Sequence, residues 1–194
     1  MKGFVVVVSG AAGSGKGTVI SELVKSNPDV KYSISCTTRA PRPGETDGVD
    51  YHFISRENFE DMIKRGEFLE HAFVHMDYYG TPKTKVDEAI ENGGVIILEI
   101  DVQGMEEMIK TYPDAVTVFI IPPSFQELEN RLRKRGTESE ESIKVRMENA
   151  KKEILKVKEY SYVVVNDDFV EAAKTLNSII IAERAKTSRN RIRV

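Results

Sequence analysis

The chain has 194 residues, of which 40% are hydrophobic and 30% are charged, and its formal net charge at pH 7 is -3. This composition is typical of a globular domain with a sizeable core, and the mild negative charge gives no overall attraction to nucleic acid. The apolar runs are strand-sized and Cys36 is the single cysteine, so the sequence predicts no membrane span, no signal peptide and no internal disulfide, and hence a cytoplasmic protein.

A glycine-rich loop follows the first predicted strand, which runs from Phe4 to about Ser9 and is apolar on both faces. A helical pattern follows the loop, and strand, loop and helix in this order form the setting in which such loops bind phosphate. Glycines let backbone N–H groups point inward, and the charge of Lys16 can reach the outer phosphates of a nucleotide. An ordinary glycine-rich turn is the less favoured alternative. The residues predicted to bind the nucleotide here are Gly10, Ala11, Ala12, Gly13, Ser14, Gly15, Lys16, Gly17 and Thr18.

Gly17 departs from the usual pattern, because a Ser or Thr normally follows the lysine and helps to hold Mg²⁺. Thr18 comes next and is a candidate contact for a phosphate oxygen or a metal-bound water. The sequence therefore leaves direct protein ligation of the metal open.

The segment after the first helix predicts short strands joined by turns. A strand near 31–35 leads into a proline-rich loop that carries Arg39 and Arg42. An Asp-Gly turn signal then precedes a predicted strand over 49–54.

A helix and a further strand come next. Ser55 is the predicted N-cap of a helix that ends at Gly66, and a strand is predicted over 68–74. Residues 78–82 predict a turn, after which Thr81 caps a helix that has a proline in its first turn.

A second buried strand, predicted over 95–101, ends in acidic residues. Glu99 and Asp101 are two positions apart, so in a strand they project from the same face at its C-terminal end. A helix is predicted over 103–112 and a third apolar strand over 116–121. Alternating strands and helices indicate a parallel, doubly wound sheet, in which ligands bind at the carboxyl ends of the strands.

The C-terminal third predicts a helical hairpin with a basic face, which we interpret as a mobile lid rather than as a solvated hairpin. Capping-box patterns at 124–127 and 137–140 open its two helices, Gly136 separates them, and the second helix runs to about Lys158. A strand over 162–165 and a helix over 169–183 follow. The basic tail, 184–194, is expected to be frayed or exposed. The basic residues of the first lid helix are Arg131, Arg133, Lys134 and Arg135.

Several motifs together resemble those of guanylate kinases, and the resemblance runs from about residue 3 to residue 185. Ser35-Cys36-Thr37-Thr38-Arg39-Ala40-Pro41-Arg42-Pro43-Gly44-Glu45 with Gly48-Val49-Asp50-Tyr51 is similar to the GMP-binding motif of that family. Later motifs match at Glu67-Phe68-Leu69-Glu70, Tyr79-Gly80-Thr81, Leu98-Glu99-Ile100-Asp101-Val102-Gln103-Gly104, Arg135-Gly136-Thr137-Glu138, Arg146 and Asn166-Asp167.

The resemblance implies a role for each matched residue. The GMP phosphate would be held by Arg39, Arg42, Tyr51 and Tyr79, and the guanine and its sugar side by Ser35, Glu70, Thr81 and Glu99. Asp101 would lie near the transferring phosphate and Mg²⁺-bound water. Arg135 and Arg146 would reach the ATP phosphates, and Asn166 would lie near the adenosine. The implied catalytic set is Lys16, Arg39, Asp101, Arg135 and Arg146.

The chemistry of Glu70 can also be argued from the base. Guanine presents two donors on one edge, N1–H and the exocyclic amine, and a carboxylate can accept both; adenine presents a lone pair at N1 instead. Hydroxyls such as those of Ser35 and Thr81 can donate to guanine O6.

The sequence therefore predicts an ATP-dependent guanylate kinase that uses Mg²⁺ as MgATP, takes GMP as acceptor and binds neither nucleic acid nor membranes. Whether dGMP is also an acceptor is left open. The expected fold is α/β: a P-loop doubly wound parallel sheet core (1–33, 83–124 and 159–194), a small mixed α/β GMP-binding insertion (34–82) and a helical lid (125–158), all in one domain. Two alternatives remain, a nucleoside monophosphate kinase of other base specificity and a non-catalytic guanylate-kinase-like binding module. The oligomeric state is left open.

Overall fold

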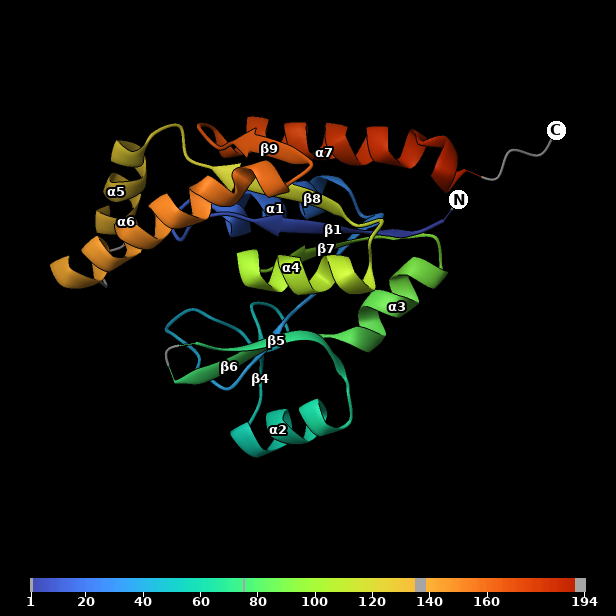
Figure 1. Cartoon of the computed structure of the whole chain (residues 1–194), viewed down its shortest axis with the longest axis horizontal. Helices are drawn as coiled ribbons and strands as arrows, with labels where there is room; N and C mark the ends of the chain where they lie inside the picture. Colours follow the sequence, from blue (N-terminus) through green and yellow to red (C-terminus); the bar gives the residue numbers. More distant parts are fainter. Residues whose placement is uncertain (1, 75, 135–138, 191–194) are drawn as a thin grey trace.

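A five-stranded parallel sheet lies at the centre of the computed structural model, which describes residues 2–74, 76–134 and 139–190 (Figure 1). Its strands, in spatial order, are β2 (Val30–Tyr32), β7 (Val95–Glu99), β1 (Phe4–Ser9), β8 (Val116–Ile121) and β9 (Tyr162–Val165). All six residues of β1 are buried, as expected for the middle strand. The prediction of a parallel sheet is confirmed, because every neighbouring pair runs parallel.

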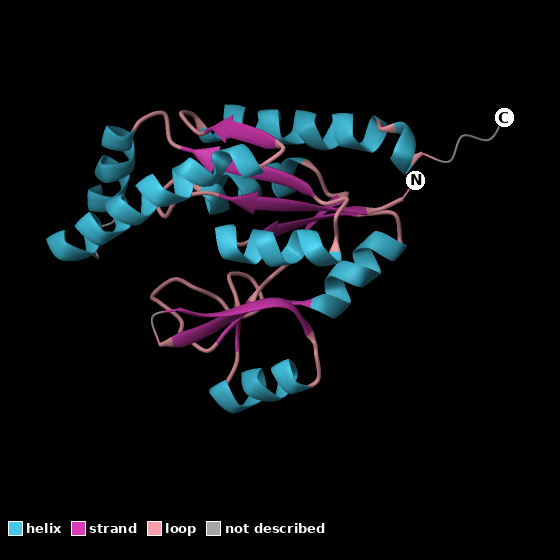
Figure 2. Cartoon of the chain, viewed as in Figure 1, coloured by secondary structure: helices cyan, strands magenta, loops and turns pink. Residues whose placement is uncertain are grey.

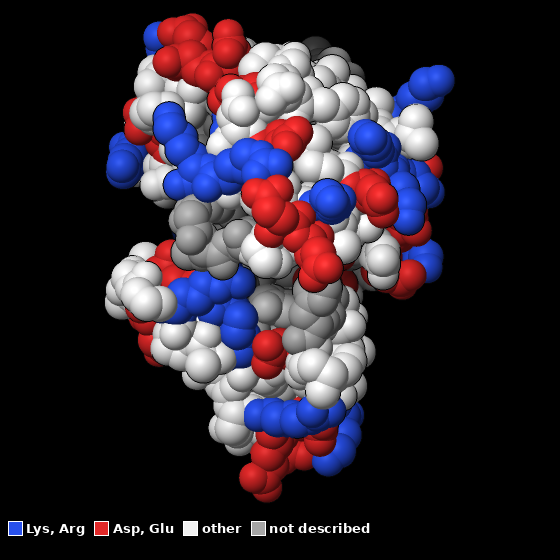
Figure 3. Space-filling view, turned by 90° about the vertical axis from the view of Figure 1, so that its left-hand side faces the viewer, with Lys and Arg blue, Asp and Glu red and all other residues white. Residues whose placement is uncertain are grey.

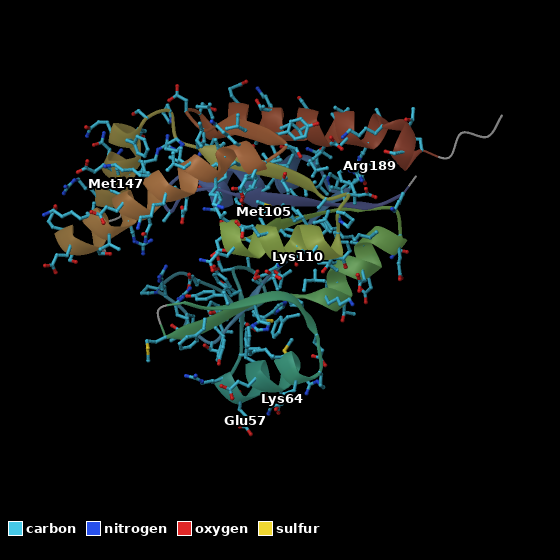
Figure 4. The ribbon with its side chains drawn as sticks, viewed as in Figure 1. Glu57, Lys64, Met105, Lys110, Met147 and Arg189 are labelled. Carbon is cyan, nitrogen blue, oxygen red and sulfur yellow. The ribbon has the colours of Figure 1, made fainter. Side chains whose placement is uncertain are left out.

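Helices cover both faces of this sheet, so the doubly wound arrangement is also confirmed. On one face, Val6 and Val8 of β1 pack in a buried cluster with α1 (Lys16–Ser26) and α7 (Phe169–Ala185). On the other, Val5 and Val7 pack in a cluster that includes residues of α3 (Lys83–Glu91) and α4 (Val102–Thr111), among them Met105, labelled in Figure 4. Alternating side chains of one strand therefore supply two cores.

A smaller sheet lies beside the α3 and α4 face, as Figure 2 shows. Its spatial order is β4 (His52–Phe53), β3 (Cys36–Thr37), β6 (Asp77–Pro82) and β5 (Phe68–Val74), and α2 (Arg56–Lys64) packs against it. Ser55 caps α2 as predicted, since its hydroxyl accepts from the Asn58 N–H at 3.2 Å. The Phe59 ring of α2 stacks between the rings of Phe68 and Tyr78, at centroid distances of 4.3 and 5.1 Å.

Three predictions for this region are wrong. The segment expected to be a turn, 78–82, belongs to strand β6, because its backbone pairs with β5 on one side and β3 on the other. Thr81 consequently lies within a strand and does not cap α3, whose N-cap is Pro82. The strand expected over 49–54 is only two residues long, β4. Pairing across the sheet, which local sequence does not encode, decided these cases.

Two further helices form a hairpin at one end of the sheet, α5 (Phe125–Lys134) and α6 (Glu140–Leu155), followed by the short 3-10 helix η1 (Lys156–Glu159). Ser124 and Ser139 cap them, accepting from backbone N–H groups at 3.1 and 3.2 Å. The second cap is thus Ser139, whereas the predicted box began at Thr137, which lies outside the described residues together with Arg135, Gly136 and Glu138. Leu128, Leu132, Ile143 and Ala150 form a buried cluster with Ala11 of the glycine loop, so the hairpin packs directly on that loop.

The predicted tail is exposed at residues 185–188, but it is not frayed there, and the prediction is wrong for Arg189, which is buried. Helix α7 continues to Ala185, and the 3-10 helix η2 (Thr187–Arg189) follows. Arg189, labelled in Figure 4, is only 8% exposed and donates to Glu183 at 3.2 Å and to the Asp114 carbonyl at 2.8 Å. Its guanidinium lies 4.2 Å from the centroid of the Phe4 ring. No described helix has the length and apolar character needed to cross a membrane.

Candidate active site

The glycine loop between β1 and α1 is tightly packed against neighbouring segments. Gly15 has φ of 85° and directly precedes α1, and a Cβ there would lie 2.3 Å from the amide nitrogen of Asn166. A Cβ at Gly10 would lie 2.2 Å from the Ile120 carbonyl oxygen. The ammonium of Lys16 donates to the carbonyls of Gly10, at 2.6 Å, and Ala11, at 3.4 Å. Only glycine fits these positions, and the lysine charge lies against the loop.

Asn166 supports the loop from beneath. Its amide donates to the Ser14 carbonyl at 2.8 Å, and its own backbone N–H donates to the Ile121 carbonyl at 2.7 Å. The side chain is 3% exposed, so this contact is internal. Asn166, which directly follows β9, therefore links the end of β8 to the glycine loop. Its predicted place beside adenosine stays a prediction.

Arg131 of α5 lies close to the glycine loop, although no individual role was predicted for it. Its Nη1 lies 3.8 Å from where a Cβ of Gly15 would be, and its Nη2 donates to the Asp167 carbonyl at 3.5 Å. Glu127, one turn earlier, accepts from its Nε at 2.7 Å. The sequence could have indicated a role for Arg131, because it is four positions before Arg135 and that spacing in a helix places two residues on one face.

Glu99 lies between the glycine loop and the smaller sheet. Its Oε2 accepts from the Tyr32 hydroxyl at 3.3 Å and lies 3.7 Å from where a Cβ of Gly17 would be. Burial raises the pKa of Tyr51 above its ordinary value, and the Glu99 carboxylate raises it further. Burial and then Glu99 also raise the pKa of Tyr32, a residue that the sequence analysis missed. Glu99 therefore stands beside both halves of the predicted site.

Asp101 does not share a strand face with Glu99, contrary to expectation. Strand β7 ends at Glu99, and Asp101 is the N-cap of α4, with Oδ1 accepting from the Gly104 N–H at 2.8 Å. The strand alternation argument fails because the chain turns into a helix at this point. Asp101 still lies at the same edge of the sheet as Glu99 and the loop.

Glu70 comes from β5 and approaches α4. Its Oε1 accepts from the Thr81 hydroxyl at 2.6 Å, across the β5–β6 pair. Burial raises the pKa of Glu70, the bonds from Thr81 lower it, and the Asp101 carboxylate raises it, with a net rise. The buried hydroxyl of Thr81 thus donates its hydrogen bond to the Glu70 carboxylate in this structure. Ser35 lies just before β3 and is half-buried.

A basic and aromatic cluster lies in the smaller sheet and its loop. Arg39 forms an ion pair with Glu45 at 2.9 Å, and its Cζ lies 5.6 Å from the centroid of the Tyr51 ring. The rings of Tyr51 and Tyr79 are 6.0 Å apart and perpendicular. Glu45 also accepts from the backbone N–H of Arg42 at 2.7 Å, while the Arg42 side chain is exposed. Glu45, which had no predicted role, holds the loop that presents both arginines.

A cavity of about 630 Å³ lies between α6, Ala12 of the glycine loop and the start of α4. Arg146 and Glu153 line it from α6, and Asp101 lines it from the start of α4. Burial raises the pKa of Glu153, the Lys16 ammonium lowers it and the Asp101 carboxylate raises it, with a net rise. Figure 3, which looks onto this end of the molecule, shows Lys and Arg side chains on both lobes. The residues that line the cavity are Ala12, Asp101, Gln103, Glu141, Ser142, Val145, Arg146, Asn149, Lys152 and Glu153.

The glycine loop, Glu99 and Asp101 thus lie at one edge of the large sheet, whereas the arginine and tyrosine cluster and Glu70 belong to the smaller sheet and its loop. Within the ranges that it describes, no group of three or more His, Cys, Asp or Glu side chains could hold a metal ion by itself. Arg135 lies outside those ranges, so its predicted position is not described.

Comparisons with known proteins agree on one family. The family model for guanylate kinase matches residues 2–183. The chain is 52% identical to a guanylate kinase of Carboxydothermus hydrogenoformans, over 100% of this chain and 95% of that protein, and 47% identical to a guanylate kinase of Clostridioides difficile, over 97% and 92%.

A solved structure gives the same result. The crystal structure of guanylate kinase from Anaplasma phagocytophilum superposes with a TM-score of 0.80 at 34% identity, covering 97% of this chain and 89% of the other. The chain carries a glycine loop at the edge of its large sheet, with an arginine and tyrosine cluster and a buried acid on its smaller sheet, and it matches these proteins along its length. It therefore belongs to the guanylate kinase family.

Proposed function

We propose that this chain transfers the γ-phosphoryl group of ATP to GMP, giving ADP and GDP, a step of purine nucleotide metabolism. The observation that carries the proposal is the position of Glu99. Its Oε2 lies 3.7 Å from where a Cβ of Gly17 would be and accepts from the Tyr32 hydroxyl at 3.3 Å, and its charge raises the pKa of Tyr51 in the arginine and tyrosine cluster. A triphosphate on the loop and a monophosphate on the arginine and tyrosine cluster would therefore meet beside one carboxylate. A cytoplasmic location stays a prediction of the sequence.

The acceptor side holds GMP by its phosphate and its base. Arg39 and Arg42 supply planar donors that match phosphate oxygens, and Tyr51 and Tyr79 supply hydroxyl donors. Glu45 keeps Arg39 oriented before GMP arrives, which reduces the entropy lost on binding. Glu70, with Ser35 and Thr81 nearby, reads the guanine edge, and Glu99 faces the sugar side.

The donor side holds ATP by its phosphates. The loop from Gly10 to Thr18 provides backbone donors at the start of α1, and Lys16 exchanges its present carbonyl partners for phosphate oxygens. Arg131 approaches the same loop, and Arg135 and Arg146 of the hairpin would complete the positive charge around the phosphates. Asn166 fixes the loop backbone through Ser14.

The residues present fit Mg²⁺ brought in with ATP rather than held in a separate protein site. Mg²⁺ usually keeps several waters and takes one or two carboxylates together with phosphate oxygens, and the cavity offers Asp101 and Glu153. Thr18 remains the candidate hydroxyl, because Gly17 has none. When bound, the ion would neutralise charge between the β- and γ-phosphates.

The reaction needs positioning and charge more than proton transfer. The phosphate of GMP is itself a nucleophile, so this chain has to align it with the γ-phosphorus and exclude water, which would otherwise hydrolyse ATP. We propose that the insertion 34–82 and the lid 125–158 close on the core 1–33, 83–124 and 159–194 to do so. Lys16 and the lid arginines then stabilise the charge that develops.

A coupled assay of ADP release tests this function across GMP, dGMP, AMP and UMP with MgATP. We expect turnover with GMP, weaker turnover with dGMP, and little with AMP or UMP. Preference for AMP or UMP would instead support a kinase of other base specificity. Absence of turnover with all four, in protein that still binds GMP, would support a binding module.

A further inference from the structure

Gly104 occupies an unusually tight position in the first turn of α4. It is buried, and its N–H donates to Asp101 Oδ1 at 2.8 Å. A Cβ at this position would lie 3.3 Å from Glu70 Oε2 and 3.2 Å from the Cβ of Ile100, closer than side chains ordinarily approach. The turn of α4 that begins at Asp101 therefore presents bare backbone to the Glu70 carboxylate.

Backbone conformation does not explain a glycine here. Gly104 is absent from the described glycines with positive φ, so its backbone is one that any residue adopts. Within a helix, alanine is favoured over glycine by about 1 kcal/mol. The glycine thus weakens α4 locally. A Cβ here would meet the Cβ of Ile100, Glu70 Oε2 and Asp101 Oδ1 at 3.2, 3.3 and 3.4 Å, and of these three only Glu70 comes from a distant part of the chain.

The Glu70 carboxylate is consequently bounded on two sides. Thr81 donates to Oε1 at 2.6 Å, and the bare turn at Gly104 lies against Oε2. A carboxylate that accepts two neighbouring donors of one base edge must hold both oxygens in place, since hydrogen bonds weaken steeply as their angles bend. One wall comes from the insertion and the other from the core.

We propose that Gly104 is a specificity-determining position, whose missing side chain lets the first turn of α4 hold Glu70 in the orientation that reads guanine. This inference rests on the proposed function, in which Glu70 accepts from guanine N1–H and the exocyclic amine. Gly104 is a positioning residue: it acts through Glu70. A methyl group at 104 displaces Oε2 by a few tenths of an ångström, and a branched side chain displaces it further.

The test is a graded series, Gly104→Ala and Gly104→Val, measured with GMP and with IMP, which lacks the exocyclic amine. We expect the KM for GMP to rise roughly threefold to tenfold for alanine and more for valine, as a strained charged hydrogen bond would give. The KM for ATP should stay unchanged, and the preference for GMP over IMP should narrow. Glu107→Val, at an exposed position of the same helix, controls for the helix propensity of valine.

A double-mutant cycle with Glu70→Gln sharpens the result. If Gly104 acts through Glu70, valine at 104 changes the GMP preference much less in the Glu70→Gln background. A folded Gly104→Val protein with unchanged KM for GMP and unchanged preference overturns the inference, as does an equal rise in the KM values for GMP and ATP. Failure of the proposed function looks different, because the unmodified chain would then show no preference for GMP over IMP.

Discussion

Replacement of Glu70 by glutamine is the most informative single perturbation of the acceptor site. The side chain keeps its shape but loses its charge and one of its two acceptor oxygens. In the structure one oxygen already accepts from Thr81 at 2.6 Å. Whichever way the new amide is oriented, an NH₂ group then faces either the Thr81 hydroxyl or the donors of guanine.

The magnitude follows from the bond that is lost. A hydrogen bond to a charged group contributes about 1.5–3 kcal/mol, so losing one lowers kcat/KM for GMP roughly tenfold to a hundredfold. The free energy of unfolding should rise or stay unchanged. Because burial raises the pKa of Glu70, the ionised carboxylate is disfavoured in the fold at neutral pH, and a neutral amide removes that cost.

The assay compares kcat/KM for GMP and IMP at saturating MgATP, together with the midpoint of thermal unfolding. We expect a large loss with GMP, a smaller loss with IMP, an unchanged KM for ATP and an unfolding midpoint at or above that of the unmodified chain. An unchanged kcat/KM for GMP in folded protein would remove Glu70 from the guanine site and refute the reasoning.

Three further outcomes are expected. Lys16→Met should leave the fold intact, by circular dichroism, but reduce phosphoryl transfer by about a thousandfold or more, since the cation for the phosphates is lost; retained activity would contradict its role. On the acid side, kcat/KM for GMP should fall through a pKa above that of an ordinary carboxyl group, because Glu70 must be ionised to accept from guanine and its pKa is raised. In Glu70→Gln this fall should be shallower, because only the GMP phosphate still titrates in that pH range. Arg189→Ala should destabilise the fold by about 3 kcal/mol, or roughly 6–12 °C, since it leaves Glu183 buried with fewer partners. Burial raises the pKa of Glu183, but the bonds it accepts from Lys186, Tyr162 and Arg189 lower it overall. The stability that these bonds contribute is therefore present above the ordinary carboxyl pKa and is lost as pH falls through the lowered pKa. A difference in unfolding free energy between Arg189→Ala and the unmodified chain that stays constant with pH would contradict this account.

The central part of the fold could be predicted from the sequence because its signals are local. Strands β1, β8 and β9 are apolar runs whose ends match the structure, and Ser55 and Ser124 carry helix-capping side chains. The glycine loop was also predictable, since its spacing and its flanking strand and helix are contiguous in the chain.

The smaller sheet was less predictable, because β3 and β4 have only two residues each and the pairing of its strands is non-local, although β5 matches its predicted range. Strand β6 contains Tyr78, Gly80 and Pro82, which locally favour a turn, and pairing on both sides overrides that preference. The buried Arg189 is a similar case, since a basic residue near a chain end is usually exposed unless a distant partner such as Glu183 receives it.

The sequence by itself determined the order of the α/β units, the loop that carries Lys16 and the types of side chain available to recognise GMP. Tertiary structure alone decided which of those side chains support one another: Asn166 beneath the loop, Glu45 behind Arg39, Tyr32 on Glu99, and Gly104 against Glu70. The physical reason is that hydrogen bonds and close approaches depend on distances of a few ångströms between segments far apart in the chain, and only the packing of two sheets and a helical hairpin sets those distances.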